Sequence, residues 1–272
     1  PNDTFTFHGL LTGAVDACGF DFAIELLDVQ ALNERVARGA FDAAKVSFAA
    51  ALGLAEEVVV LPVGAAVGRG VGPVVLAPRR AAASDTSLTS RRAASKFVLA
   101  PGEQTTAALL WRLFHPGEGT LKHVVFSEIM PALARGAAWR GVCIHEGRFA
   151  YGAWDLELVE DLGATWEHAT GLPLPLGGIV ARRRLGPERW ARLTQPIRNS
   201  LAYARADPQR ALASMRLHAQ EQADAVLWKH VELYVTHDTE DLSDEARRAL
   251  VELVLRAVGA GAAPGGATLD VA

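Results

Sequence analysis

The sequence predicts an α/β protein of two lobes, with a cleft between the lobes and a helical C-terminal part. Three observations lead to this prediction. The 272 residues exceed what one hydrophobic core usually serves. Short apolar runs alternate with helical patterns, which is typical of α/β sheets. The stretch 79–95 (RRAAASDTSLTSRRAAS) then loses apolar periodicity, and a second α/β pattern begins after it.

The chain is expected to leave the first lobe, build the second one and return to finish helically. Two crossings of this kind place the cleft at the hinge between the lobes. The predicted division assigns residues 1–78 and 182–272 to lobe I, 79–95 to a linker and 96–181 to lobe II.

Lobe I is expected to open with a helix through 5–11, which Asn2 or Asp3 caps. A second helix follows Asp28 and stops at Gly39. Because strands and helices alternate along this part of the chain, the pattern predicts a parallel sheet. The strands are expected at 24–27, 44–48, 58–61 and 74–76, with a short helix at 49–55.

A glycine-rich segment at 64–73 precedes the last of these strands. Its glycines at 68, 70 and 72 invite a dinucleotide-binding interpretation, but that fingerprint follows a strand and opens a helix. Here Pro73 and a β-branched run continue as a strand. We therefore exclude a dinucleotide site and expect flexible backbone near a ligand, or a bend between the lobes.

Lobe II is predicted to repeat the alternation, with a helix that begins at Thr105 and Thr106. The segment 172–178 contains two prolines and two glycines, so we expect irregular structure there and the second crossing between lobes. From Gly186 onward the apolar spacing is helical. The strands are expected at 96–100, 121–126, 141–145, 156–162 and 179–181.

His145 ends the strand predicted at 141–145 and is followed by Glu146 and Arg148. In open α/β sheets, ligands bind beyond the carboxyl ends of the strands. Imidazole titrates nearest neutrality, so His145 is the candidate proton acceptor. The alternative is a histidine that only caps the strand, while Glu146 pairs with Arg148 structurally.

Two further groups of polar residues follow strand ends. Lys45 and Ser47 flank a strand-to-helix turn, where a cation and a hydroxyl could face a ligand. Thr105 and Thr106 offer hydroxyls and free amides at a helix start, which suits a carboxylate. A surface lysine and plain capping by Thr105 are the alternatives. We expect both groups to converge with His145 at the cleft.

Composition excludes several classes of function. The net charge of -4, with no basic stripe, argues against a nucleic-acid surface. Cys18 and Cys143 form no CxxC pair, which suits a reducing compartment, and with no signal peptide a cytoplasmic location is expected. No run of about 18 apolar residues predicts a membrane span. His218, His230 and His237 lack metal spacing and are expected on the surface or in packing roles.

Several stretches, taken in order and at their spacing, together resemble one family. They are PNDTF, LLDVQALNE, KVSFAA, GRGVGPVVL, GEQTT, IHEGRFAY and GATWEHATGLPLPLGGI. The set is similar to the 1,4-dihydroxy-6-naphthoate synthase family of the futalosine route to menaquinone, from residue 1 to about residue 235. Gly147 stands where a serine is more usual in that family, and Gln104 where a histidine can occur.

The resemblance implies a type II periplasmic-binding-protein-like fold. It also implies a lyase that converts cyclic dehypoxanthine futalosine to 1,4-dihydroxy-6-naphthoate, with His145 as the general base and no metal or other cofactor. The implied partner is a small-molecule carboxylate, and nothing predicts the oligomeric state. The implied substrate-binding residues are Lys45, Val46, Ser47, Thr105 and Thr106, with Asn2 and Arg148 as further candidates.

Two alternatives stay open. Chorismate dehydratase of the same pathway is a related enzyme on the same fold, and an assay of both substrates separates the two. A solute-binding protein would capture a small anion without chemistry. That second alternative predicts a secretory or lipoprotein leader and binding that His145→Ala leaves unaffected.

Overall fold

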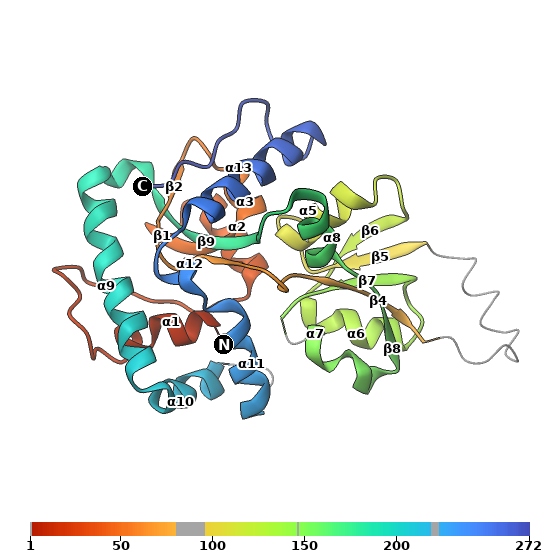
Figure 1. The fold of residues 1–272 in the computed structure, drawn as a ribbon, viewed down its shortest axis with the longest axis horizontal. Helices are drawn as coiled ribbons and strands as arrows, with labels where there is room; N and C mark the ends of the chain where they lie inside the picture. Colours follow the sequence, from red (N-terminus) through yellow and green to blue (C-terminus); the bar gives the residue numbers. More distant parts are fainter. Residues whose placement is uncertain (1, 80–95, 146, 219–222) are drawn as a thin grey trace, which may run out of the picture.

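The computed structural model describes every residue of the chain except 1, 80–95, 146 and 219–222. Figure 1 shows two lobes, each built around its own sheet, as the sequence predicts. The sheet of lobe I contains β1 (Ala43–Ser47), β2 (Val58–Val60), β3 (Ala66–Gly68) and β9 (Leu174–Arg182). The sheet of lobe II has the order β6 (Thr120–His123), β5 (Phe97–Ala100), β7 (Arg140–Cys143), β4 (Val74–Pro78) and β8 (Leu156–Asp161).

The sheet of lobe I is not purely parallel, so that prediction was wrong. β9 lies between β1 and β2 and pairs antiparallel with both, and also with β3. The physical reason is that β9 returns from lobe II, and so enters the sheet from the opposite direction to β1 and β2. In lobe II, β5 pairs parallel with β6 and β7, whereas β4 runs antiparallel to β7 and β8.

The segment 172–178 was expected to be irregular, but most of it belongs to β9. Pro175 can lie in this strand because there β9 pairs only with β3, and the register shifts between Ala66 and Val67 at that point. Gly178 is required by packing, because a Cβ there would lie 2.7 Å from the Phe48 ring. A close approach of two elements explains this glycine better than a loop does.

Three other sequence expectations differ from the structure. Residues 24–27 form no strand, although Leu26 and Leu27 contribute to the cleft. β4 belongs to the sheet of lobe II, so the first crossing precedes Val74 and does not follow residue 78. β9 already belongs to lobe I from Leu174 onward, where lobe II was expected to extend to 181. Nearly all of the predicted linker lies outside the described residues.

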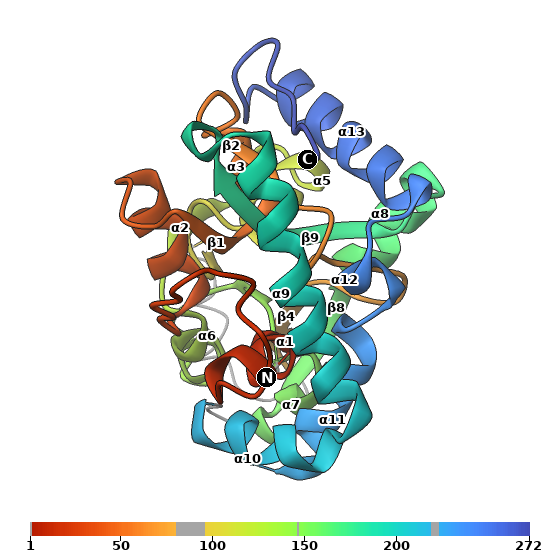
Figure 2. The same ribbon diagram turned by 90° about the vertical axis from the view of Figure 1, so that its left-hand side faces the viewer.

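The helices cover the sheets and fill the space beside the cleft. In lobe I, α9 runs along α1 (Figure 2), and the helical C-terminal part is confirmed. Asn2 and Asp3 lie in the first turn of α1 and do not precede it. The helices of lobe I are α1 (Asn2–Leu11), α2 (Val29–Ala37), α3 (Phe48–Leu52), α9 (Pro187–Ala206), α10 (Pro208–His218), α11 (Asp224–Tyr234), α12 (His237–Glu240) and α13 (Asp244–Gly259). Those of lobe II are α5 (Thr106–Phe114), α6 (Phe126–Ala134), α7 (Gly147–Ala150) and α8 (Leu162–Thr170), with a 3-10 turn at Tyr151–Trp154; a second 3-10 turn, Arg183–Leu185, joins β9 to α9 in lobe I.

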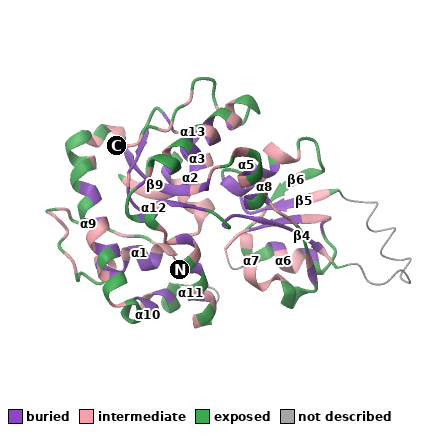
Figure 3. Cartoon of the chain, viewed as in Figure 1, coloured by how far each residue is buried: buried purple, intermediate pink, exposed green. Residues whose placement is uncertain are grey.

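The largest apolar cluster contains residues of both lobes, and Figure 3 shows buried residues along the strands of both sheets. At the crossing between β3 and β4, Gly72 has φ +121 and packs against β9, where a Cβ would lie 2.6 Å from Leu174. Gly163 of α8 approaches the same crossing, since its Cβ would meet the Val71 carbonyl oxygen. The bend expected in the glycine-rich segment is therefore a tightly packed hinge.

Candidate active site

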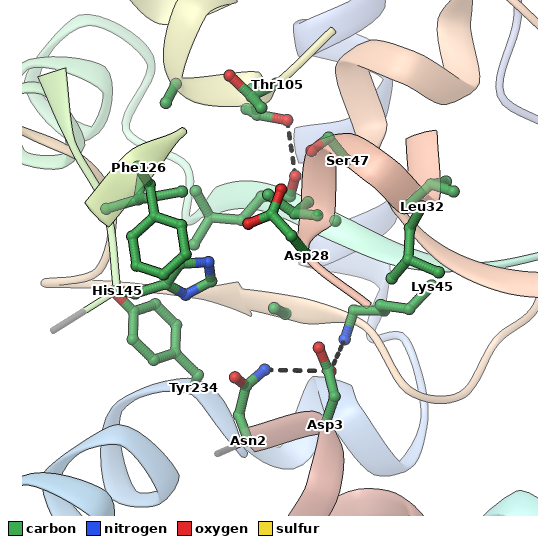
Figure 4. A pocket seen from close by; sticks show the side chains of 18 of the residues that line it. Asn2, Asp3, Asp28, Leu32, Lys45, Ser47, Thr105, Phe126, His145 and Tyr234 are labelled. Atoms are coloured by element: carbon green, nitrogen blue, oxygen red, sulfur yellow. Dashed lines mark hydrogen bonds and ion pairs between the residues drawn. The ribbon is translucent and has the colours of Figure 1, made fainter. Parts of the chain in front are cut away.

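A cavity of about 390 Å³ lies between the lobes. Its walls come from both of them, and the close-up in Figure 4 shows the polar residues directed toward it. Apolar side chains supply much of the surface, which suits an aromatic guest. Lobe I contributes Asn2, Asp3, Thr4, Leu26, Leu27, Asp28, Val29, Leu32, Lys45, Val46, Ser47, Ala66, Leu176, Gly177, His218 and Tyr234, while the hinge and lobe II contribute Gly72, Pro73, Thr105, Thr106, Ala107, Phe126, Ile144 and His145.

His145 stands just beyond the carboxyl end of β7 and lines the cavity. Its backbone has φ 53, in the left-handed region, which costs a residue other than glycine about 1–2 kcal/mol. This turn ends the strand and projects the imidazole between the rings of Phe126 and Tyr234 (Figure 4). The Phe126 ring meets it edge-on, with centroids 5.0 Å apart. The structure thus places the His145 imidazole beyond the strand end and in the lining of the cavity, where the sequence led us to expect it.

His230 of α11 lies directly behind His145, with ring centroids 6.0 Å apart. It is fully buried, and neither ring nitrogen has a hydrogen-bond partner among the described residues. Burial, and secondarily the nearby charge of His145, lower the pKa of His230 to about 3. Tyr234 and Phe149 pack against the same ring. The sequence predicted a surface or packing role for His230, and its burial among these rings is a packing role.

Thr105 caps α5 as predicted. Its hydroxyl donates to the Gly102 carbonyl oxygen at 2.9 Å and accepts from the Ala108 N–H at 3.2 Å. The N–H groups of Thr106 and Ala107 come in the first turn of α5, where no intrahelical acceptor exists for them. Both residues line the cavity, so these amides and the positive end of the helix can receive a carboxylate.

Thr106 also lines the cavity, but its hydroxyl already bridges the lobes. It donates to the Leu176 carbonyl oxygen of β9 at 2.6 Å and accepts from the Ala49 N–H at 3.3 Å. The hydroxyl hydrogen is therefore not available to a ligand. The Thr106 side chain therefore contributes to the contact between the lobes.

Lys45 is drawn toward α1. Its ammonium donates to Asp3 Oδ1 at 2.8 Å and to the Gly64 carbonyl oxygen at 2.7 Å. Burial raises the pKa of the Asp3 carboxyl, but the charge and hydrogen bond of Lys45 outweigh it and hold that pKa below its usual value. Asn2 donates to Asp3 Oδ1 at 3.1 Å. Lys45, Asp3 and Asn2 together form a polar floor on the lobe I side (Figure 4).

Arg148 does not line the cavity. Its guanidinium donates to Asp161 at 2.5 Å and to the Gly72 carbonyl oxygen at 3.2 Å. It therefore ties the segment after His145 to the hinge, and Glu146, the partner considered from the sequence, lies outside the described residues. Phe126, Tyr234 and Asp28 were not predicted as cavity residues, since helix-capping and apolar residues carry no chemical signal of their own.

A sequence profile of menaquinone biosynthesis proteins matches residues 1–258 of the chain. The chain belongs to the menaquinone biosynthesis family. Two relatives of this family member are named 1,4-dihydroxy-6-naphtoate synthase. That of Thermus thermophilus is 41% identical over 265 residues, which cover 97% of this chain and 93% of the relative. That of Streptomyces coelicolor is 38% identical over 270 residues, covering 97% and 92%. Both are enzymes, so the predicted resemblance and the expectation of an enzyme are confirmed.

Solved structures similar to this menaquinone biosynthesis protein confirm the fold. A crystal structure of an Archaeoglobus fulgidus protein has a TM-score of 0.85 at 27% identity and covers 96% of this chain and 94% of its own. The alkanesulfonate-binding protein of Xanthomonas axonopodis pv. citri, bound to MOPS, has a TM-score of 0.64 at 14% identity, with coverage of 90% and 84%. The latter likeness shows the periplasmic-binding-protein-like fold alone.

Among the residues that the structure describes, no helix is long and apolar enough to cross a membrane. Within the same described ranges, no group of three or more histidine, cysteine, aspartate or glutamate side chains is arranged to hold a metal ion.

Proposed function

We propose that the protein is a lyase that converts cyclic dehypoxanthine futalosine to 1,4-dihydroxy-6-naphthoate, with His145 as the general base. The observation that carries the proposal is the position of the His145 imidazole. It faces a cavity between the lobes, with Ser47 and Lys45 on the opposite wall (Figure 4). Membership of the menaquinone biosynthesis family and the names of the two relatives support a naphthoate product.

The chemistry fits the groups around the cavity. A neutral imidazole removes a hydroxyl proton from the bound substrate, and that oxygen becomes the carbonyl of the departing ribose-derived fragment as the carbon–carbon bond to the ring breaks. The electron pair of the broken bond passes into the ring, which becomes aromatic and takes up a proton. General-base help of this kind accelerates a reaction by about 10²–10⁴. The walls from both lobes exclude water from the reacting atoms.

The first turn of α5 is the proposed site for the substrate carboxylate. Thr106 and Ala107 line the cavity from the first turn of α5, where backbone N–H groups have no intrahelical acceptor and the helix dipole adds attraction for an anion. The apolar wall, which includes Phe126, Ile144 and Leu176, would then contact the ring. A carboxylate at α5 and a base at β7 place the ring across the cavity between them.

The direct test is an assay of the purified protein with cyclic dehypoxanthine futalosine and, separately, with chorismate, followed by mass spectrometry of the products. We expect 1,4-dihydroxy-6-naphthoate from the first and unchanged chorismate in the second. Consumption of chorismate alone would identify a dehydratase and overturn the proposal. Tight binding of the first substrate without turnover would identify a binding protein and overturn it equally.

A further inference from the structure

Asn33 of α2 is a polar residue that the structure buries completely next to the cavity. Its side chain contacts two groups on different lobes. Nδ2 lies 3.3 Å from Ser47 Oγ and 3.3 Å from the Gln104 carbonyl oxygen, while Oδ1 lies 3.0 Å from the Ser47 backbone nitrogen. Asn33 does not itself line the cavity, whereas Ser47 does.

The orientation of the Asn33 amide follows from its backbone partners. The Ser47 N–H can only donate, so the atom that faces it must be the amide oxygen. The Gln104 carbonyl can only accept, so the atom that faces it must be the amide nitrogen. Both requirements agree, and a flipped amide would violate both of them at once.

This orientation fixes the direction of the hydrogen bond to Ser47. The Asn33 Nδ2 group has two hydrogens and no acceptor capacity, so Ser47 Oγ must accept from it. The Ser47 hydrogen is then left over, and it has no acceptor among the described residues. Thr105 and Thr106, by contrast, give their hydroxyl hydrogens to carbonyl oxygens of the protein. Of these three hydroxyls, Ser47 alone can donate into the cavity.

We propose that Asn33 is a positioning residue that holds the Ser47 hydroxyl as a hydrogen-bond donor to an oxygen atom of the substrate. The inference rests on the proposed function for the identity of that substrate. The second Nδ2 hydrogen reaches the Gln104 carbonyl oxygen of lobe II, so this contact adds to the orientation that the Ser47 N–H already imposes on the amide.

The test replaces Asn33 by an isosteric group that cannot donate. In Asn33→Asp the oxygen that faces Ser47 becomes an acceptor, so the hydroxyl turns toward it and presents only lone pairs to the cavity. Since a hydrogen bond contributes about 0.5–1.5 kcal/mol, we expect KM for the substrate and Kd for 1,4-dihydroxy-6-naphthoate to rise by about two- to tenfold. We expect kcat to change by less than about twofold, because the proton acceptor His145 is untouched.

The control for a merely structural effect is a double-mutant cycle. In a Ser47→Ala background, Asn33→Asp has no hydroxyl left to redirect, and we expect it to change Kd by less than about twofold. Asn199→Asp makes the same chemical change on α9, away from the cavity lining, and is expected to leave KM and kcat unchanged. Asn33→Ala buries no charge and is measured in the same double-mutant cycle. It replaces Asn33→Asp if thermal unfolding shows that the buried carboxylate disrupts the fold.

A wild-type Kd in a folded Asn33 variant would overturn the inference. An Asn33 effect of equal size with and without the Ser47 hydroxyl would overturn it as well. The proposed function fails in a different way, because the wild-type protein would then not form the naphthoate from cyclic dehypoxanthine futalosine. The turnover assay of the wild type therefore tests the function, and calorimetric titration of the wild type and the Asn33 variants with 1,4-dihydroxy-6-naphthoate tests the inference.

Discussion

The imidazole of His230 stacks on the imidazole of His145, with ring planes 28° apart. His230 is fully buried, so its charged form is disfavoured and its pKa falls to about 3. The His230 ring that stacks on the proposed general base is therefore neutral throughout the physiological pH range. A cation in this position would repel a proton on His145 and would oppose its role as a base.

This burial predicts an acid-dependent loss of stability. In the unfolded chain His230 takes up a proton below about pH 6.5, whereas in the folded protein it does so only near pH 3. The unfolded state thus binds more protons between these values. The free energy of unfolding consequently falls by about 1.4 kcal/mol per pH unit on acidification through this window, from this residue alone.

His230→Phe keeps a ring in the stack and removes the titrating group. We expect urea denaturation from pH 7 to pH 4.5 to show a shallower loss of stability in this variant than in the wild type. His168→Gln, at an exposed position on α8, is the matched control and should keep the wild-type slope. Equal slopes in His230→Phe and the wild type would show that His230 is protonated in the folded protein.

Substitutions of Thr106 can separate the role of its side-chain hydroxyl from the role of its backbone N–H. Thr106→Val keeps the shape but leaves the Ala49 N–H and the Leu176 carbonyl without their partner. We expect a loss of about 1–3 kcal/mol in the free energy of unfolding, because buried polar groups left unpaired are costly. Thr106→Ser retains both hydrogen bonds and should lose less. If the valine variant were as stable as the serine variant but bound ligand poorly, the hydroxyl would belong to the substrate.

Arg148 joins the segment after His145 to the hinge. Its ion pair with Asp161 is mostly buried, with side-chain exposures of 16% and 24%. Arg148→Met should lower the free energy of unfolding by about 1–3 kcal/mol, as expected when a charged hydrogen-bond partner is removed. Arg38→Met removes an exposed pair with Glu34 and should cost less than about 0.5 kcal/mol. Comparable losses of unfolding free energy in the two variants would mean that the Arg148 ion pair stabilises the protein no more than an exposed ion pair does.

The parts of the site that the sequence predicted are those that local rules determine. Thr105 caps α5 because a capping side chain bonds to an amide only three residues away. His145 follows an apolar strand, and the end of a strand in an α/β lobe is where ligands bind. In these cases the deciding contact is close in sequence.

The parts that were missed depend on contacts distant in sequence. β9 contains Pro175 because β3 offers a shifted register there, which the segment 172–178 does not reveal by itself. The donor role of Ser47 depends on Asn33 and on Gln104 of the other lobe. Asn33 lies one helical turn before the buried Val36, so a polar residue on the apolar face of α2 was the one available signal.

The measurement that tests the central claim most directly is single-turnover conversion of cyclic dehypoxanthine futalosine by His145→Asn. Asparagine tolerates the left-handed backbone found at this position, but its amide cannot act as a base. The account predicts a fall in rate of about 10²–10⁴. It also predicts that Kd for the naphthoate product stays within about threefold of the wild-type value. A variant that formed 1,4-dihydroxy-6-naphthoate at close to the wild-type rate would contradict the account.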